Sequence, residues 1–358
     1  MVFSRINCPH VLQVYLKNMN AKPIDVLIRY PLTEEQIDQL GAISPRLRFS
    51  FFPDEKIQDV PADVLENAEI LLTGKALPPV EKVPSLRWVQ FTYAGIDFVR
   101  DHPLIKKENV IATTLSGAAS PKVAEYAVMA MLALGHKLPS MIQYQEKKIW
   151  PSDRWDRFQP KELRGAVVGL LGYGSIAREI ARLLKPFGAT ILATKNNLMN
   201  LEQTGYIPVG TGDRQGILYD RIYPPEAMHS MLRECDFVIV TLPLTDETRD
   251  VIGAQELAQM RPSAYLVALG RGGQVNEDAL VAALRKKKIA GAILDVFQTE
   301  PLPQDSPLWE IPRLVITPHI AGDTSLYSEL VFDLFKENLS RYLTGQKVLN
   351  VFEVQRGY

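Results

Sequence analysis

The chain has 358 residues, with 40 Lys or Arg against 41 Asp or Glu and a formal net charge of −1. This length suits two domains of ordinary size, and 46% hydrophobic with 23% charged residues is typical of a folded, soluble protein rather than a disordered one. The even charge gives no electrostatic reason to expect nucleic acid or a membrane surface as partner, and 2 cysteines cannot by themselves form a disulfide framework or a four-ligand zinc site.

The first part of the chain alternates short apolar runs with stretches of helical period, which is the pattern of a parallel α/β fold. Residues 1–22 lack a sustained apolar stretch, so we expect a poorly ordered N-terminal extension, with a transit peptide as the alternative. Strands are expected at residues 24–30, 47–53, 68–74, 86–91 and 109–115. A long helix from residue 121 to about residue 150, briefly interrupted near Pro139, should lead out of this first domain.

A second series of strands follows, each a nearly continuous apolar run, as expected for strands that helices cover on both faces. They are expected at residues 166–172, 190–195, 237–243, 264–270, 291–297 and 313–319. Six strands match the doubly wound sheet of dinucleotide-binding domains. A last helix, about residues 326–344, is expected to return the C-terminus to the first domain.

The first strand of the second series runs into Gly172, Gly174 and Ala177, which have the spacing of the G-x-G-x-x-G/A dinucleotide-binding fingerprint. Gly172 permits the tight turn, Gly174 lets the backbone approach a pyrophosphate, and Ala177 is small enough for the helix to pack on the sheet. Backbone N–H groups at the start of the helix should then face the phosphates. A glycine-rich turn without a ligand is the alternative, which the flanking strand and helix disfavour.

Three later strands end in residues suited to chemistry. Arg271 follows the strand at 264–270, and His319 ends the last strand. Between these two in the chain, Asp295 lies near the end of the strand expected at residues 291–297, and Glu300 lies in the loop that follows it. Because ligands of an open α/β sheet bind beyond the carboxyl ends of its strands, we expect these loops to meet at one site.

These side chains match the needs of hydride transfer to a 2-keto acid. The guanidinium of Arg271 suits the carboxylate and carbonyl oxygens together. The imidazole of His319 suits proton donation to the carbonyl oxygen, and a paired Glu300 would favour the charged imidazole and fix its orientation. Asp295 is expected to hold the nicotinamide side of a cofactor. Taken singly, a surface arginine, a structural histidine and a Glu-Pro turn are plainer interpretations, which their joint occurrence disfavours.

These segments resemble the D-2-hydroxyacid dehydrogenase family, which includes glyoxylate/hydroxypyruvate reductases, over nearly the whole chain from Ile24 onward. The resemblance is strongest at residues 172–177, 270–273, 295–303 and 317–322. It implies two Rossmann-like doubly wound α/β domains, with the cofactor domain inserted into a discontinuous substrate domain. On that basis the substrate domain comprises residues 23–118 and 326–358, and the dinucleotide-binding domain comprises residues 119–325.

The resemblance also implies the site residues. The catalytic set is Arg271, Glu300 and His319. Substrate contacts are expected from a loop that resembles the carboxylate-binding loop of the family and from two catalytic residues: Tyr93, Ala94, Gly95, Arg271 and His319. Cofactor contacts are expected at the strand ends of the second domain: Gly172, Tyr173, Gly174, Ser175, Ile176, Thr194, Lys195, Asn196, Leu242, Pro243, Leu269, Gly270, Asp295, His319 and Gly322. No metal is expected.

Two further features bear on assembly and cofactor choice. Residues 123–126 resemble the start of a helix that often contacts a second subunit in the family, which implies a homodimer, and Tyr126 stands where the family usually has His. In family members that use NAD, an acid ends the second strand of the cofactor domain, whereas here that strand ends in Thr194, Lys195, Asn196 and Asn197. We therefore predict NADP as the preferred cofactor, with NAD as the alternative. The plainer interpretation makes Lys195 only a solvated strand end.

Residues 198–225 lengthen the next crossover and contain the glycines and prolines typical of loops. The segment is expected to cover the adenosine end of the cofactor, to reach another subunit, or to be a plain surface excursion. In each case we expect it to be dispensable for the hydride step itself.

We predict a cytoplasmic NAD(P)-dependent oxidoreductase that acts on the CH–OH group of a small D-2-hydroxy acid, of the glyoxylate/hydroxypyruvate type. A formate- or phosphite-type dehydrogenase is one alternative, although formate enzymes have Gln where this chain has Glu300. A nucleotide-sensing, corepressor-like interaction protein is the alternative from another class, for which the sequence shows no added basic or disordered tail.

Overall fold

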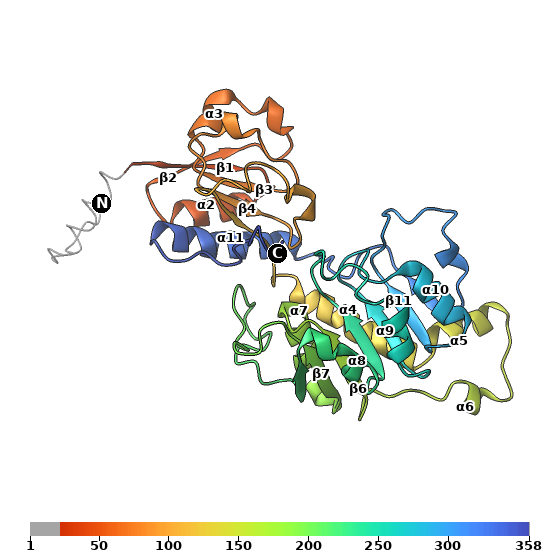
Figure 1. The fold of residues 1–358 in the computed structure, drawn as a ribbon. Helices are drawn as coiled ribbons and strands as arrows, with labels where there is room; N and C mark the ends of the chain where they lie inside the picture. The colour runs from red at the N-terminus through yellow and green to blue at the C-terminus, as the bar shows by residue number, and fades with distance from the viewer. Residues whose placement is uncertain (1–21, 358) are drawn as a thin grey trace, which may run out of the picture. The chain divides into compact units, whose positions relative to one another are not determined.

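The computed structural model describes residues 22–357, so the expected N-terminal extension lies outside the described residues except for Lys22. The chain divides into two compact units (Figure 1). Of the described residues, the discontinuous unit contains those up to Leu115 together with Ser328–Gln355, and the inserted unit contains Ser116–Tyr327 with Arg356 and Gly357. In the part of the chain that the structure describes, no helix has the length and apolar character needed to cross a membrane.

The discontinuous unit is built on a parallel sheet of five strands in the order β2-β1-β3-β4-β5. The strands are β1 (Ile24–Ile28), β2 (Leu47–Phe51), β3 (Ile70–Thr73), β4 (Trp88–Phe91) and β5 (Ile111–Thr113). All five lie within the stretches predicted as strands. Helices α2 (Glu34–Gly41) and α3 (Ala62–Asn67) lie in the first two crossovers. Thr33 starts α2 because its hydroxyl accepts the Gln36 N–H, while the Gln36 side chain accepts the Thr33 N–H.

The C-terminal helix α11 (Tyr327–Leu343) belongs to this unit, and its position in the sequence was predicted correctly. The ring of Phe335 on α11 lies 5.6 Å from the buried Trp88 ring of β4. Asn338, fully buried, donates from its amide to Gln90 Oε1 at 2.9 Å. The chain after α11 then forms an antiparallel bridge to β5. The last part of the chain therefore completes a sheet that begins with the first strand.

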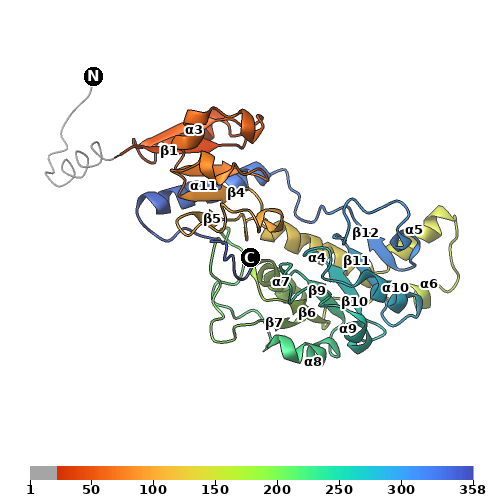
Figure 2. The same cartoon turned by 45° about the horizontal axis from the view of Figure 1, so that its top comes forward.

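The inserted unit is built on a parallel sheet of seven strands in the order β12-β11-β10-β9-β6-β7-β8. All of these strands except β8 are labelled in Figure 2. The strands are β6 (Val167–Leu171), β7 (Thr190–Thr194), β8 (Arg221–Tyr223), β9 (Phe237–Val240), β10 (Tyr265–Ala268), β11 (Gly291–Leu294) and β12 (Leu314–Ile316). The first six in chain order follow the Rossmann arrangement, and β12 extends the sheet by one strand. The strand order reverses between β6 and β9, which is where such sheets bind ligands.

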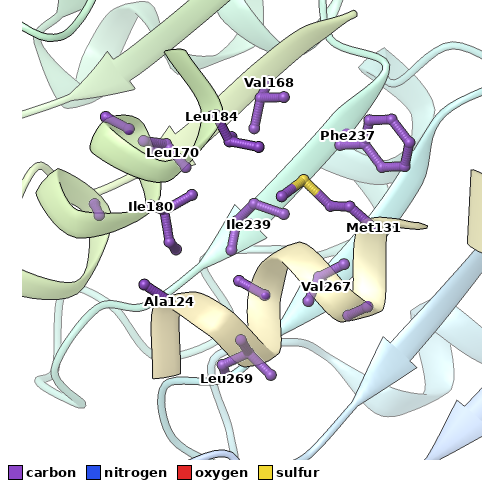
Figure 3. Close-up of a cluster of buried hydrophobic side chains, with 14 of the residues drawn as sticks. Ala124, Met131, Val168, Leu170, Ile180, Leu184, Phe237, Ile239, Val267 and Leu269 are labelled. Atoms are coloured by element: carbon purple, nitrogen blue, oxygen red, sulfur yellow. The ribbon is translucent and has the colours of Figure 1, made fainter. Parts of the chain in front are cut away.

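Helices cover both faces of this sheet. On one face, α4 (Ser120–Gly135) and α7 (Ser175–Leu184) enclose a buried apolar cluster against β6, β9 and β10 (Figure 3). A second buried cluster lines the other face, where α8 (Met228–Leu232), α9 (Ala254–Gln259) and α10 (Glu277–Arg285) pack. The near-continuous apolar runs predicted as strands are apolar on both sides because both sides are covered.

The long helix predicted from residue 121 to about residue 150 is instead two helices. α4 ends at Gly135, Lys137 adopts a left-handed conformation with a φ of 57°, and α5 (Leu138–Glu146) begins anew. Pro139 explains the break, since proline lacks an N–H and clashes with the preceding turn inside a helix, but is tolerated in the first turn of a new one. The brief interruption predicted near this proline is therefore a full break between two separate helices.

The strand β8 was not predicted. It lies within the segment 198–225 and pairs in parallel with β7, with Leu192 opposite Arg221. Three residues at a sheet edge leave too short an apolar run to distinguish from a loop. Because this segment contributes a strand and a set of buried contacts to α7, it is not the plain surface excursion that was one of the expectations.

Candidate active site

The glycine fingerprint forms the turn between β6 and α7. Gly172 has a φ of 81°, which favours glycine, and a Cβ there would lie 2.4 Å from Leu242 Cδ2. The Gly172 N–H donates to Thr194 Oγ1 at 2.9 Å, which fastens the turn to the end of β7. Gly174 immediately precedes α7, and open space surrounds the position that its Cβ would occupy.

This turn fits the pyrophosphate of a dinucleotide. No side chain caps the N-terminus of α7 at Ser175, which leaves backbone N–H groups of the first helical turn for a ligand. Open space beside Gly174 allows a close backbone approach, and Ala177 is fully buried against the sheet. Ile176 packs partly into the same core. The geometry suits the cofactor contacts predicted for these residues, which stay predictions.

Two residues predicted to contact the cofactor have side chains engaged elsewhere. The ring of Tyr173 is 1% exposed and its hydroxyl donates to Asp213 Oδ2 at 2.8 Å. The Thr194 hydroxyl, also buried, accepts the Gly172 N–H. The Thr194 hydroxyl oxygen therefore holds the glycine turn, and the predicted contact of Thr194 with the cofactor stays a prediction.

Lys195 is the first residue after β7 and is half-buried. Burial lowers the pKa of its ammonium group, and the nearby Arg178 guanidinium lowers the pKa further. Asn196 is exposed, whereas the Asn197 side chain accepts the Met199 N–H and so shapes the next turn. The end of β7 thus presents one cation, Lys195, and one exposed amide, Asn196. It has no acidic side chain from residue 194 to residue 197.

Gln274 joins the loops after β9 and β10, a role that the sequence did not reveal. Its fully buried side chain donates from Nε2 to Leu242 O at 2.6 Å and to Pro243 O at 3.0 Å, and accepts the Arg271 N–H at 3.0 Å. Gly270 lies so close that a Cβ there would be 2.3 Å from Gln274 Oε1. The predicted cofactor residues Leu242, Pro243 and Gly270 therefore form one interlocked edge.

Arg271 lies on this edge, three residues after the end of β10 at Ala268 and beyond the buried Leu269. Its Nη1 donates to Gly270 O at 2.8 Å. The next residue, Gly272, is packed so tightly that a Cβ would lie 1.7 Å from Phe297 O. Only glycine fits there, and its close approach holds the Arg271 loop against the loop that follows β11.

The structure brings His319 and Glu300 together. His319 Nδ1 and Glu300 Oε2 are 2.6 Å apart, and Glu300 Oε1 accepts the Phe297 N–H at 2.9 Å. The two side chains are 46% and 33% exposed, so a ligand has access to the pair. His319 has a φ of 54°, a conformation that residues other than glycine adopt rarely and that clusters at functional sites. With Nδ1 held by the carboxylate, Nε2 is the nitrogen left for proton transfer.

The buried carboxylate of Asp295 holds the loop that carries this histidine. Oδ1 accepts the Thr317 hydroxyl at 2.6 Å and the Ile320 N–H at 3.1 Å, and Oδ2 accepts the Ala321 N–H at 2.8 Å. Gly322 follows directly in the chain. These bonds give Asp295 a positioning role for His319, while its contact with a nicotinamide stays a prediction.

Tyr126 on α4 contacts the loop that carries His319. Its phenol is hydrogen-bonded to Thr317, and burial raises the pKa of Tyr126, with the Asp295 carboxylate adding to the effect. The sequence marked Tyr126 only as a departure from the family pattern. A contact between residues so far apart in the chain has no sequence signal of its own, so neither its link to Thr317 nor the support of His319 was foreseen.

The predicted substrate loop of Tyr93, Ala94 and Gly95 follows β4 in the discontinuous unit. The Tyr93 ring is 38% exposed and meets Phe98 edge-on, with 5.9 Å between ring centroids. Lys75 Nζ lies 5.7 Å from the Tyr93 ring centroid. The part of this loop in substrate binding stays a prediction.

The inserted unit therefore combines a dinucleotide turn with a carboxylate-held histidine and a neighbouring arginine, at the carboxyl edge of one sheet. A guanidinium and an imidazole at such an edge suit a substrate that carries both a carboxylate and a carbonyl oxygen. Among residues 22–357 no group of three or more His, Cys, Asp or Glu side chains is placed to hold a metal ion.

Known proteins are similar in sequence to the region that forms this combination of a dinucleotide turn, a histidine and an arginine. The family described as D-isomer specific 2-hydroxyacid dehydrogenase, NAD binding domain, matches residues 128–321, more than half of the chain. A glyoxylate/hydroxypyruvate reductase A of Klebsiella pneumoniae is 31% identical over 288 residues, which cover 78% of this chain and 85% of that protein.

Two crystal structures are similar in fold. A D-isomer specific 2-hydroxyacid dehydrogenase family protein of Aeromonas salmonicida has a TM-score of 0.74 and 30% identity over 93% of this chain and 100% of that one. A D-isomer specific 2-hydroxyacid dehydrogenase of Xanthobacter autotrophicus, solved with NADPH and MES, has a TM-score of 0.74 and 26% identity over 94% and 100%. The chain belongs to the D-isomer specific 2-hydroxyacid dehydrogenase family, and it is an oxidoreductase that uses a nicotinamide dinucleotide to interconvert 2-hydroxy and 2-keto acids.

Proposed function

We propose that this enzyme reduces small 2-keto acids of the glyoxylate and hydroxypyruvate type to D-2-hydroxy acids, with NADPH as the preferred donor. The observation that carries the reaction is the 2.6 Å contact between His319 and Glu300 beside the Arg271 loop. The glyoxylate/hydroxypyruvate reductase of Klebsiella pneumoniae, 31% identical, supports the substrate class.

In this proposal each protein group has one task. The bound nicotinamide supplies the hydride to the carbonyl carbon. Arg271 binds the carboxylate and polarises the carbonyl oxygen, since a guanidinium offers parallel N–H donors. His319 gives its Nε2 proton to that oxygen, and Glu300 keeps the ring oriented by accepting from Nδ1. Tyr93, Ala94 and Gly95 are assigned to the substrate on the strength of the family resemblance.

The preference for NADPH rests on the end of β7. NADPH and NADH differ by a phosphate on the adenosine ribose, and an acid at this strand end would repel that phosphate. Lys195 stands there instead, half-buried, and the exposed Asn196 amide adjoins it. The Xanthobacter autotrophicus relative, solved with NADPH, supports this choice.

We further propose a cytoplasmic homodimer that binds neither nucleic acid nor membrane. Several large apolar side chains of α4, α5 and the stretch after them are exposed, which is unusual for a monomer and is typical of a protein interface: Met129, Leu138, Met141, Ile142, Trp150 and Trp155. Light scattering on the purified protein tests this, and Ile142→Glu with Trp150→Ser should shift a dimer towards monomer. A monomeric wild type would contradict the assembly proposal alone.

A steady-state screen tests the reaction. The kcat/KM for glyoxylate, hydroxypyruvate, pyruvate and phenylpyruvate is measured with NADPH and with NADH. We expect the highest values with NADPH and one of the first two acids. Oxidation of formate without reduction of any keto acid would favour the formate-type alternative, and nucleotide binding without turnover would favour the interaction-protein alternative.

Lys195→Asp tests the basis of the cofactor preference. A net effect of about 1.4 kcal/mol gives tenfold discrimination, and the attraction between a cation and a phosphate at ~4 Å is a few kcal/mol at the protein surface before the cost of desolvation. We expect this substitution to move the preference towards NADH, chiefly through the KM of the cofactor. Lys82→Asp, the same charge change at an exposed site of the discontinuous unit, is the matched control and should leave the preference unchanged.

A further inference from the structure

The segment from residue 198 to residue 218, which we call the brace segment, is attached to the dinucleotide turn through a buried polar network. Arg178, on the first turns of α7, has a side chain only 2% exposed. Its guanidinium donates to Leu201 O at 2.6 Å and to Asp213 O at 2.8 Å, both in the brace segment. The same group donates from Nε to Tyr173 O at 3.2 Å, in the middle of the fingerprint. One arginine thus joins two carbonyls of the brace segment to the cofactor turn.

Asp213 is the second centre of the network. Its buried carboxylate accepts the Tyr173 hydroxyl at 2.8 Å and the N–H groups of Ile217 and Leu218 at 3.0 and 2.9 Å. The Arg178 guanidinium also lies 4.5 Å from the centre of the Tyr173 ring. The side chain between the two fingerprint glycines is therefore fixed on its face by an arginine and at its hydroxyl by an aspartate.

Two more contacts fasten the brace segment around α7. The buried carboxylate of Glu179 accepts the Gly212 N–H at 2.6 Å and pairs with Arg182 at the same distance. A Cβ on Gly117, just before α4, would lie 2.4 Å from Tyr206 O, so the backbone of the brace segment is pressed against the residues leading into α4. The segment is thus held on both sides of the turn that starts α7.

Packing alone does not require this many buried charged and hydrogen-bonded side chains. Burying charged groups costs free energy unless each is hydrogen-bonded, and apolar side chains of similar size usually stabilise a fold as well or better. A satisfied polar network does, however, select one arrangement of the backbone that it touches. The backbone touched here is the Tyr173 peptide, flanked by Gly172 and Gly174, where sub-ångström placement decides whether the N–H groups meet a pyrophosphate.

We propose that the brace segment is a positioning element for cofactor binding, and that Tyr173, Arg178 and Asp213 are the positioning residues through which it holds the dinucleotide turn. The part of this proposal that concerns the 2′-phosphate rests on the proposed NADPH preference. The part that concerns the pyrophosphate does not, because both nicotinamide dinucleotides carry that group.

A second consequence concerns the strand end beside the network. The Gly172 N–H is held by Thr194, and Lys195 follows Thr194 in the chain. Burial lowers the pKa of Lys195, and the nearby charge of Arg178 lowers it further. Holding Arg178 in place therefore keeps a second positive charge near Lys195, where it adds to the attraction for a 2′-phosphate. Loss of this charge should weaken NADPH more than NADH.

The test measures cofactor affinity directly, apart from turnover. Tyr173→Phe removes only the hydroxyl that reaches Asp213 and keeps the ring, so it is the variant most certain to fold. Asp213→Asn replaces one acceptor oxygen with a donor that faces other donors. The dissociation constants of NADPH and NADH are measured by fluorescence titration of the full-length protein, with thermal unfolding in the absence of cofactor. Val209→Ser, at a fully exposed site of the brace segment, is the matched control.

We expect Tyr173→Phe to raise both dissociation constants about tenfold, the effect of losing one hydrogen bond to a charged group, with kcat at saturating cofactor changed less than about threefold. Asp213→Asn should raise both constants further, and Val209→Ser should change neither. A Tyr173→Phe protein that is folded, has a lower Tm and binds both cofactors as the wild type does would overturn the proposal, since the network would then serve stability alone.

Arg178→Lys and Arg178→Met separate charge from geometry. The lysine variant keeps a positive charge but cannot reach both carbonyls of the brace segment, so we expect both dissociation constants to rise with their ratio unchanged. The methionine variant should raise the constant for NADPH more than that for NADH. If the wild type prefers NADH, the proposed cofactor preference fails, while the effect of Tyr173→Phe on NADH still decides the positioning role.

Discussion

Glu300 Oε2 lies 2.6 Å from His319 Nδ1, and Glu300 Oε1 accepts the N–H of Phe297 three residues before it. The carboxylate is thereby fixed by its own loop, and the imidazole is fixed by the carboxylate. His319 also has a backbone conformation with a φ of 54°. Because the carboxylate and the imidazole are both already fixed in position, this proton donor needs little reorganisation before it reacts.

Removal of either member of this pair should lower kcat far more than it affects cofactor binding. His319→Ala deletes the proton donor, and general acid catalysis is worth about 10²–10⁴-fold. Glu300→Gln keeps an acceptor for the Nδ1 proton but removes the negative charge beside the ring, so its loss of kcat should be smaller than that of His319→Ala. Steady-state kinetics and NADPH titration of both variants are the measurements. A kcat near that of the wild type in His319→Ala would remove His319 from the mechanism.

Asp295 and Tyr126 should show graded effects, because they support the His319 loop with different strength. Asp295→Asn puts an amide nitrogen where the carboxylate accepts three hydrogen bonds from the loop, and we expect a loss of about 2 kcal/mol or more in the free energy of unfolding together with a lower kcat. Tyr126→Phe removes one hydroxyl and leaves the Thr317–Asp295 bond, so its effect on kcat should stay within a few-fold. Equal effects of the two substitutions would contradict this order of support.

The two fingerprint glycines should respond differently to alanine. Gly172 has a φ of 81° and its Cβ would meet Leu242, so Gly172→Ala should lower Tm, with about 1–2 kcal/mol expected for the left-handed conformation alone. Gly174 has a φ of −90° and open space around its Cβ position, so Gly174→Ala should keep the Tm of the wild type. It should nevertheless weaken both cofactors, because the added methyl group points into the space assigned to the pyrophosphate. Unchanged cofactor affinity in Gly174→Ala would place the pyrophosphate elsewhere.

The KM for NADPH should depend on pH at alkaline values, whereas the KM for NADH should not. Burial, with help from Arg178, lowers the pKa of Lys195, so this lysine loses its proton at a lower pH than an exposed lysine does. The charged form binds a 2′-phosphate, and the neutral form does not. The KM for NADPH should therefore be lowest below the pKa of Lys195 and rise as the pH passes through it. Parallel pH profiles for the two cofactors would show that Lys195 does not bind the phosphate.

The sequence predicted most of the framework because the framework depends on local patterns. Every strand made of a continuous apolar run was located, and the break near Pro139 was marked by the proline itself. The order of Arg271, Glu300 and His319 along the chain predicted a catalytic set, and the structure brings Glu300 and His319 into contact. Such features are properties of one segment at a time.

The parts of the fold and of the site that the sequence did not predict depend on contacts between segments that are distant in the chain. β8 has only three residues and owes its existence to the edge of β7. The Thr194 hydroxyl accepts the N–H of Gly172, a residue 22 positions earlier, and no local pattern indicates this bond. Arg178 looks like an ordinary exposed helix residue until Leu201 and Asp213 fold over it. No periodicity or motif marks such pairs, because each partner gains its role only from the other.

The return of α11 to the first sheet has a consequence for synthesis on the ribosome. Strands β1 to β5 emerge first, but Trp88 and Gln90 gain their partners Phe335 and Asn338 only when α11 has left the exit tunnel. Residues 116–327, which make up nearly all of the inserted unit, have been synthesised before then. Nascent chains should therefore acquire nucleotide affinity while the N-terminal sheet still lacks its covering helix, and truncation before residue 328 should leave the middle of the protein folded and its beginning dependent on chaperones.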